Sequence, residues 1–127
     1  MSLFVNLHVK DLAASLGFFE KLGYSVDEQL TNDDAGCLHL GEGVSLLLVT
    51  EPFFTSITGK AIPDTGASTE VALALQVEGG RAKVDEMLTT ALANGASEAG
   101  EPEDNEYMYS RSFRDLDGHL WSVLVMA

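Results

Sequence analysis

The predicted order of secondary-structure elements occurs twice along this chain of 127 residues. A strand at Phe4–Val9 and a helix at Leu12–Lys21 open the first half, and a strand at Val71–Val77 and a helix at Arg81–Ala93 open the second. Three shorter apolar segments follow each pair. A single half could not bury the apolar face of its sheet, so the halves must pack together or across a dimer. We therefore predict an α+β fold of two βαβββ modules that share a cleft.

The first helix shows how clear these signals are. Asp11 can accept hydrogen bonds from the free N–H groups of the first turn. Leu12, Leu16 and Phe19 then recur with helical spacing and form one apolar stripe. Gly23 can adopt the left-handed conformation that ends a helix. In the second half, Asn94-Gly95 ends the helix in the same way.

The boundary between the halves follows from a change in composition. Residues 52–69 are rich in Gly, Pro, Ser and Thr, and we predict a loop. This loop joins module 1–51 to module 70–127 within a single domain of residues 1–127. It also contains Phe53, Phe54 and Ile57, so we expect it to pack against the protein, over the cleft.

The last two strands are predicted at Tyr107–Arg114 and His119–Met126, with Asp115-Leu116-Asp117-Gly118 between them. Asp-Gly is typical of a hairpin turn. The same Asp-x-Asp-Gly could begin a calcium-binding loop, but no later ligands follow it, which favours the turn.

The composition narrows the class of partner. Twenty acidic residues against seven basic ones give a net charge of −13, which repels nucleic acid and anionic lipid. No segment is apolar enough for a membrane helix, and no basic n-region precedes the first strand. The single cysteine, Cys37, excludes an internal disulfide and fits a reducing compartment. We expect a cytoplasmic protein that binds neither nucleic acid nor membrane.

Two motifs carry a family resemblance. The first is Val9-Lys10-Asp11-Leu12-Ala13-Ala14-Ser15, with Phe18-Phe19 and Leu22-Gly23-Tyr24 after it, and the second is Arg111-Ser112-Phe113-Arg114-Asp115-Leu116-Asp117-Gly118-His119. Together they resemble the vicinal oxygen chelate superfamily, which includes glyoxalases, bleomycin-resistance proteins and dioxygenases. The resemblance spans essentially the whole chain. It implies a mixed sheet that curls around a cleft and a homodimer, but it specifies no reaction.

Metal-dependent members of this superfamily place His, Glu or Gln at four strand positions that face the cleft. The resemblance puts these positions at Phe4, within Val44–Val49, near Ala72 and at Ser122. Val44–Val49 contains only Val, Ser and Leu, and a shift of one residue at the other positions supplies no ligand. We therefore expect no metal and no other cofactor. His8, His39 and His119 could form a different site only if three ligands converged.

Strand parity predicts what lines a metal-free cleft. Phe4, Asn6 and His8 share one face of the first strand, because Val5, Leu7 and Val9 are uniformly apolar and should meet the helix. The predicted ligand-binding residues are Phe4, Asn6, His8, Ala72, Gln76, Tyr109, Arg111, Phe113 and Ser122. Small and apolar residues with scattered polar groups are typical of a small-molecule site.

Several roles stay open. Arg111 either pairs with a nearby carboxylate or binds an anionic group of a ligand. His8 could carry a proton or could be a hydrogen-bonded histidine at a strand end. Cys37 has no basic neighbours in sequence that would activate it, and no Gly-x-Ser-x-Gly motif or phosphate-binding loop is present. No catalytic residue can be named.

Three hypotheses follow from these observations. The first is a metal-free protein of the bleomycin-resistance kind, which binds a small organic ligand in its cleft. The second is an enzyme, either a glyoxalase-type lyase or isomerase or a dioxygenase-related enzyme, with a non-standard site. The third is an interaction module whose cleft is residual. The acidic surface and the replaced metal ligands favour the first.

Overall fold

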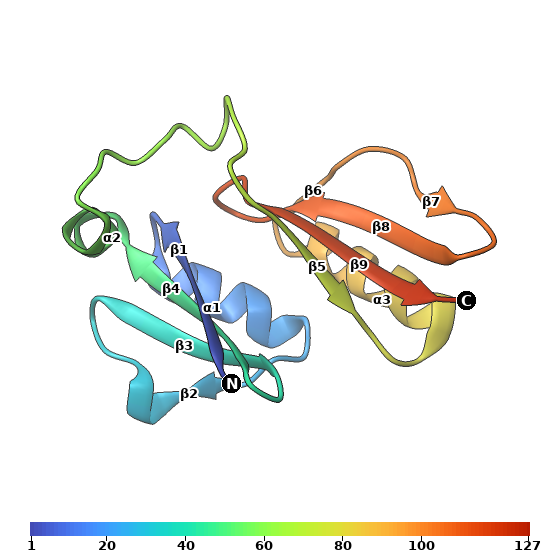
Figure 1. Cartoon of the computed structure of the whole chain (residues 1–127), viewed down its shortest axis with the longest axis horizontal. Coiled ribbons are helices and arrows are strands. Elements are labelled where there is room, and N and C mark those ends of the chain that lie inside the picture. The colour runs from blue at the N-terminus through green and yellow to red at the C-terminus, as the bar shows by residue number, and fades with distance from the viewer. The chain divides into compact units, whose positions relative to one another are not determined.

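The computed structural model describes residues 1–127, which divide into two compact units, Met1–Pro63 and Asp64–Ala127. The boundary lies within the predicted joint between the halves. Each unit contains one mixed sheet with a long helix on one face (Figure 1). The predicted α+β class is confirmed. No helix is long and apolar enough to span a membrane.

The first unit has the strand order β1-β4-β3-β2. Its strands are β1 (Leu3–Val9), β2 (Val26–Asp27), β3 (Ala35–Gly41) and β4 (Val44–Thr50), and a 3-10 turn at Glu28–Leu30 follows β2. Strand β1 runs parallel to β4, and the other pairs are antiparallel. Helix α1 (Leu12–Lys21) begins after Asp11, whose side chain accepts a hydrogen bond from the Ala14 N–H at 3.1 Å. The predicted N-cap is therefore confirmed.

The second unit repeats this order as β5-β9-β8-β6, and β7 also pairs with β8. Its elements are β5 (Ala72–Gln76), α3 (Gly80–Ala93), β6 (Ser97–Glu98), β7 (Glu103–Asp104), β8 (Met108–Arg114) and β9 (Leu120–Met126). Strand β5 is parallel to β9, as β1 is to β4. The repeat seen in the sequence is thus a repeat of sheet topology.

The prediction of a loop at residues 52–69 is wrong for the first part of that segment, because Glu51–Thr58 forms helix α2. Pro52 suggested a loop, but proline is well tolerated in the first turn of a helix, where its missing N–H costs nothing. Gly59 ends α2 with a left-handed φ of 71°. The helix packs on β1 and β4, and the Phe54 ring lies 5.1 Å from the His8 ring.

Each core lies between the sheet and its long helix. In the first unit, Gly36 of β3 allows close approach of α1, because a Cβ at this position would lie 2.6 Å from Leu16 Cδ2. In the second unit, Trp121 and Phe113 are directly opposite each other on β9 and β8, and both are fully buried. The turn before β9 is held by Asp115, which accepts from the Trp121 indole at 2.9 Å. The predicted hairpin turn is confirmed.

Candidate functional site

Each sheet has a second face, which lies away from α1 or α3 and which we call the open face. Register and helix contacts decide which residues belong to it. Gly36 faces Leu16 of α1, and Leu48 and Leu7 lie beside Gly36 across the strands. The alternate residues therefore form the open face of the first unit. They include Phe4, Asn6, His8, His39, Ser45 and Leu47.

The predicted residues of β1 occupy this open face, but they differ in exposure. The Phe4 side chain is half exposed, at 50%. His8 lies near the other end of the strand and is buried, with the Phe54 ring of α2 against it. Helix α2 therefore covers the open face around His8 and leaves Phe4 accessible to a ligand.

In the second unit, Ala72 and Gln76 lie on the open face of β5, and both are exposed. Ser122 of β9 pairs in register with Ala74 and with Ser112 of β8. The hydroxyls of Ser112 and Ser122 are 2.7 Å apart and form a hydrogen bond. The centre of this open face thus combines a small methyl side chain with two hydroxyl groups.

Tyr109, Arg111 and Phe113 were expected to line the cleft together with Ser122, but the structure places them on the other face of the sheet. Tyr109 donates to Asp85 of α3 at 2.5 Å, and Arg111 donates to the same carboxylate at 3.2 Å. All three residues therefore lie on the helix face of β8. Register explains this, because Phe113 lies opposite Trp121, which belongs to the core under α3.

Arg111 pairs with carboxylates, which was one of its two predicted roles. Its guanidinium contacts Asp85 and also Glu98 of β6, the latter at 3.4 Å. The hydrogen bond from Tyr109 is the largest influence that holds the pKa of Asp85 below its ordinary value, and Arg111 acts in the same direction. The same bond raises the pKa of the Tyr109 hydroxyl. This cluster joins α3 to β6 and β8.

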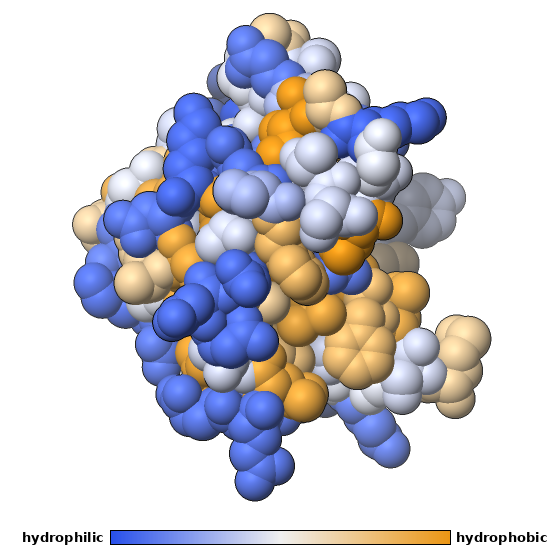
Figure 2. Space-filling view, turned by 90° about the vertical axis from the view of Figure 1, so that its left-hand side faces the viewer, coloured by the Kyte–Doolittle hydropathy of each residue, from blue (hydrophilic) through white to orange (hydrophobic).

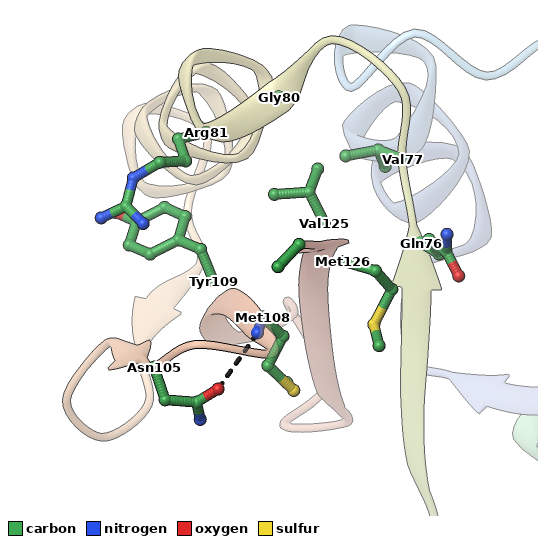
Figure 3. A pocket seen from close by; sticks show the side chains of 10 residues that line it. Gln76, Val77, Gly80, Arg81, Asn105, Met108, Tyr109, Val125 and Met126 are labelled. Atoms are coloured by element: carbon green, nitrogen blue, oxygen red, sulfur yellow. Dashed lines mark hydrogen bonds between the residues drawn. The ribbon is translucent and has the colours of Figure 1, made fainter.

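A pocket of about 580 Å³ opens at the ends of β5 and β9, beside the start of α3 (Figure 3). Gln76 and Tyr109 both contribute to its wall, so the structure brings together two of the predicted residues. Its apolar lining comes mainly from Val77, Met108, Val125 and Met126. The full lining is Gln76, Val77, Gly80, Arg81, Asn105, Met108, Tyr109, Val125, Met126 and Ala127.

Several polar groups of this pocket already have partners within the protein. The Arg81 guanidinium lies 4.1 Å from the centre of the Tyr109 ring and binds both carboxylate oxygens of Asp104. Asn105 Oδ1 accepts from the Tyr107 and Met108 N–H groups, which leaves its amide NH₂ to donate. Neither Arg81 nor Asn105 was singled out from the sequence. Packing of α3 on β8 brings Arg81 beside Tyr109, and pairing of β7 with β8 places Asp104, the neighbour of Asn105, opposite Tyr109.

The residues at the positions expected for metal ligands do not fit a divalent ion. The open face of β4 presents Ser45, Leu47 and Val49, while Phe4, Ala72 and Ser122 occupy the other three positions. No imidazole or carboxylate is among them, and such ions need convergent groups of this kind. The chain contains no group of three or more His, Cys, Asp or Glu residues that could hold a metal ion.

Several large apolar side chains are exposed on the surface of the first unit. Figure 2, seen from the left-hand side of Figure 1, shows apolar side chains gathered between hydrophilic ones. In this unit the large apolar side chains with the greatest exposure are Met1, Leu3, Phe4, Leu30, Phe53 and Ile57.

The chain was compared with known proteins and with solved structures. No protein-family model and no curated protein matches the chain. Among solved structures, a hypothetical protein from S. aureus is similar with a TM-score of 0.85 and 26% identity, over 98% of this chain and 93% of that one.

Two similar structures have descriptive names. One is a glyoxalase/bleomycin resistance protein/dioxygenase family enzyme from Burkholderia phytofirmans PsJN, with a TM-score of 0.83 and 16% identity, over 98% of this chain and 97% of that one. The other is a glyoxalase-related enzyme from Fulvimarina pelagi, with a TM-score of 0.81 and 19% identity, over 98% and 87%. The chain therefore has the fold of the vicinal oxygen chelate superfamily, as its two sequence motifs predicted.

Proposed function

We propose that the protein binds a small organic molecule on its open faces without a metal ion, in the manner of a bleomycin-resistance protein. One observation carries the proposal. The strand positions at which related proteins bind metal here hold Phe4, Ala72 and Ser122, and no nearby side chain restores a set of ligands.

The side chains that remain suggest the chemistry of the ligand. Phe4 offers an exposed aromatic ring, Ala72 leaves space beside β9, and the Ser112–Ser122 pair offers hydroxyl groups. Asn6 and Gln76 add amides at other points of the open faces. A net charge of −13 disfavours anions. We therefore propose a flat, neutral or cationic compound with an aromatic or other apolar part.

A ligand screen tests this proposal. Purified protein is heated with a library of neutral and cationic aromatic compounds, in paired samples that contain EDTA or nickel chloride. We expect saturable increases in melting temperature that are equal in the two series. An absence of stabilisation across the library would contradict binding, and stabilisation only with nickel would contradict the metal-free site.

A matched pair of variants locates the ligand. If the Phe4 ring contacts the ligand, Phe4→Ala should cost about 1 kcal/mol of binding free energy, or roughly a fivefold increase in Kd. Phe53→Ala removes an exposed ring from α2 and should leave Kd unchanged, since Phe53 is 37% exposed and lies outside the open-face strands. Equal effects of the two substitutions would show that the ligand binds elsewhere.

Elemental analysis addresses the enzyme hypothesis. Protein is analysed before and after incubation with nickel or zinc and dialysis. Near-zero metal in both samples is expected. Stoichiometric metal, or a lyase activity that EDTA abolishes and nickel restores, would support the glyoxalase-type alternative instead.

We also propose a homodimer in the cytoplasm. Strands β1 and β5 each have only one hydrogen-bonded neighbour in their sheet, so each presents an edge that a second chain could cover. The single cysteine is free and buried, which fits a reducing compartment. Light scattering coupled to size-exclusion chromatography should give twice the chain mass of 13.6 kDa, and a monomer across the accessible concentration range would refute the dimer.

A further inference from the structure

Three side chains of the first unit form a continuous hydrogen-bonded row across adjacent strands. The Asp27 carboxylate of β2 lies 2.8 Å from His39 Nε2 on β3, and His39 Nδ1 lies 2.9 Å from Ser45 Oγ on β4. His39 and Ser45 are directly opposite each other in the register. The row therefore rests on three hydrogen-bonded strands.

The hydrogen bonds determine which ring nitrogen carries the proton. An ionised carboxylate only accepts hydrogen bonds, so His39 Nε2 donates to Asp27. In the neutral ring, Nδ1 is then the acceptor, and the Ser45 hydroxyl donates to it. Asp27 also accepts from the Gln29 N–H at 3.1 Å. The hydrogen bond with His39 is the largest influence that holds the pKa of Asp27 below its ordinary value.

The repeated fold does not require this row. Register relates the first unit to the second, so that Leu120 occupies the position of Ser45 and Arg114 that of His39. Arg114 instead donates to Thr69 and to the Gly118 carbonyl. The second unit thus maintains the same strand pairing with no serine and no histidine at these positions.

We propose that Asp27, His39 and Ser45 make Ser45 a nucleophile toward small carboxylic esters. Ser45 Oγ attacks the ester carbon while its proton moves to His39 Nδ1, and the same proton leaves with the departing alcohol. A C–O bond to Ser45 forms and the C–O bond to the alcohol breaks. Water then gives a proton to Nδ1 as its oxygen bonds to the acyl carbon. The C–O bond to Ser45 breaks, the acid leaves, and Nδ1 returns the proton to Ser45 Oγ. Asp27 stabilises the imidazolium in both steps.

Exposure limits the size of the substrate. The His39 side chain is 52% exposed, but Ser45 is buried at 6% and lies beside Phe4 in the register. Only a small acyl group can reach Oγ, so acetyl esters should react faster than long-chain esters. This inference goes beyond ligand binding and does not depend on it.

Covalent labelling tests the proposal on the unmodified protein. The chain is incubated with methanesulfonyl fluoride, a small reagent whose S–F bond breaks as Ser45 Oγ bonds to sulfur and HF is released. Intact mass should show a single addition, and peptide mapping should place it on Ser45. Absence of label, or label on other residues with Ser45 unmodified, would overturn the proposal without the need for a variant.

Hydrolysis of p-nitrophenyl acetate gives the second measurement. Ser45→Ala should abolish catalysed hydrolysis, and His39→Gln should lower it by about 100-fold or more, since a general base contributes at least this much. Asp27→Asn should lower it less. Ser97→Ala, which removes an exposed hydroxyl on β6, is the matched control and should have no effect. Equal rates in the Ser45→Ala and unmodified proteins would overturn the proposal.

The ligand screen and the covalent labelling, both carried out on the unsubstituted protein, separate the two proposals. Stabilisation by ligand with no labelling of Ser45 would overturn only the nucleophile. Labelling of Ser45 with no stabilisation by any compound would overturn only the binding function.

Discussion

Loss of the Asp115 carboxylate should destabilise the second unit strongly. One oxygen accepts from the Asp117 and His119 N–H groups at 2.9 and 3.0 Å, and the other accepts from the Trp121 indole at 2.9 Å. The Trp121 and His119 donors are buried, whereas the Asp117 N–H is only partly buried and can find water. Asp115→Ala therefore leaves two buried donors without their acceptor.

The number of buried donors left without an acceptor sets the expected loss of stability. Each buried donor left unsatisfied costs about 1–3 kcal/mol, so Asp115→Ala should lower the free energy of unfolding by about 4 kcal/mol. Asp115→Asn retains one oxygen for the two backbone donors but turns an NH₂ group toward Trp121, and it should cost about 2 kcal/mol. Both are large fractions of the roughly 5–15 kcal/mol that stabilises a typical domain.

Urea unfolding followed by far-ultraviolet circular dichroism measures these changes. The tryptophan signal is unsuitable, because the substitution alters the surroundings of the indole itself. Asp33→Ala is the matched control, since it removes an equal charge from an exposed turn and should change stability little. A loss below about 1 kcal/mol for Asp115→Ala would refute the reasoning, because water would then be serving these donors.

Four further outcomes are expected. Gly118→Ala should cost about 1–3 kcal/mol in urea unfolding, because φ is +85° and the new Cβ would lie 2.8 Å from a backbone carbonyl oxygen. Tyr109→Phe should cost about 1 kcal/mol, and Asp85→Asn should lower the pKa of Tyr109 in a spectrophotometric titration, because the bond to Asp85 raises it. The folded pKa of Asp27 lies below its ordinary value of 3.8, so its stabilising effect is present above that value and is lost as the pH falls through the folded pKa. The stability advantage over Asp27→Asn should therefore shrink in acid, and a constant difference across the acid range would contradict this.

The repeat, the long helices and the last hairpin were predictable from sequence because each depends on local signals. Asp11 caps α1 where the apolar stripe begins, and Asp115–Gly118 forms the turn before β9. Helix α2 was not predicted, because the Gly, Pro, Ser and Thr content of residues 52–69 indicated a loop and the place of Pro52 in the segment was not considered. Pro52, taken as a breaker, lies in the first turn, where proline favours a helix.

The faces of the strands were predictable only where an apolar pattern fixed them. Val5, Leu7 and Val9 assigned β1 correctly, whereas β8 alternates aromatic, hydroxyl and basic residues with no clear apolar face. Its orientation became clear only from its register with Trp121. The row of Asp27, His39 and Ser45 could not be predicted from the sequence. Asp27 and His39 are twelve positions apart and His39 and Ser45 are six apart, and only strand register brings them together.

The bond between Ser112 and Ser122 has a consequence for the breadth of ligands that the second unit could accept. Either hydroxyl can be the donor, and whichever one accepts keeps its own proton for another partner. Rotation of the two hydroxyl hydrogens about their Cβ–Oγ bonds therefore changes which serine, on β8 or on β9, can donate to a ligand, while every heavy atom stays in place. A ligand whose carbonyl approaches either strand can then be served by the same surface, so the polar centre of this face is tolerant of ligand orientation.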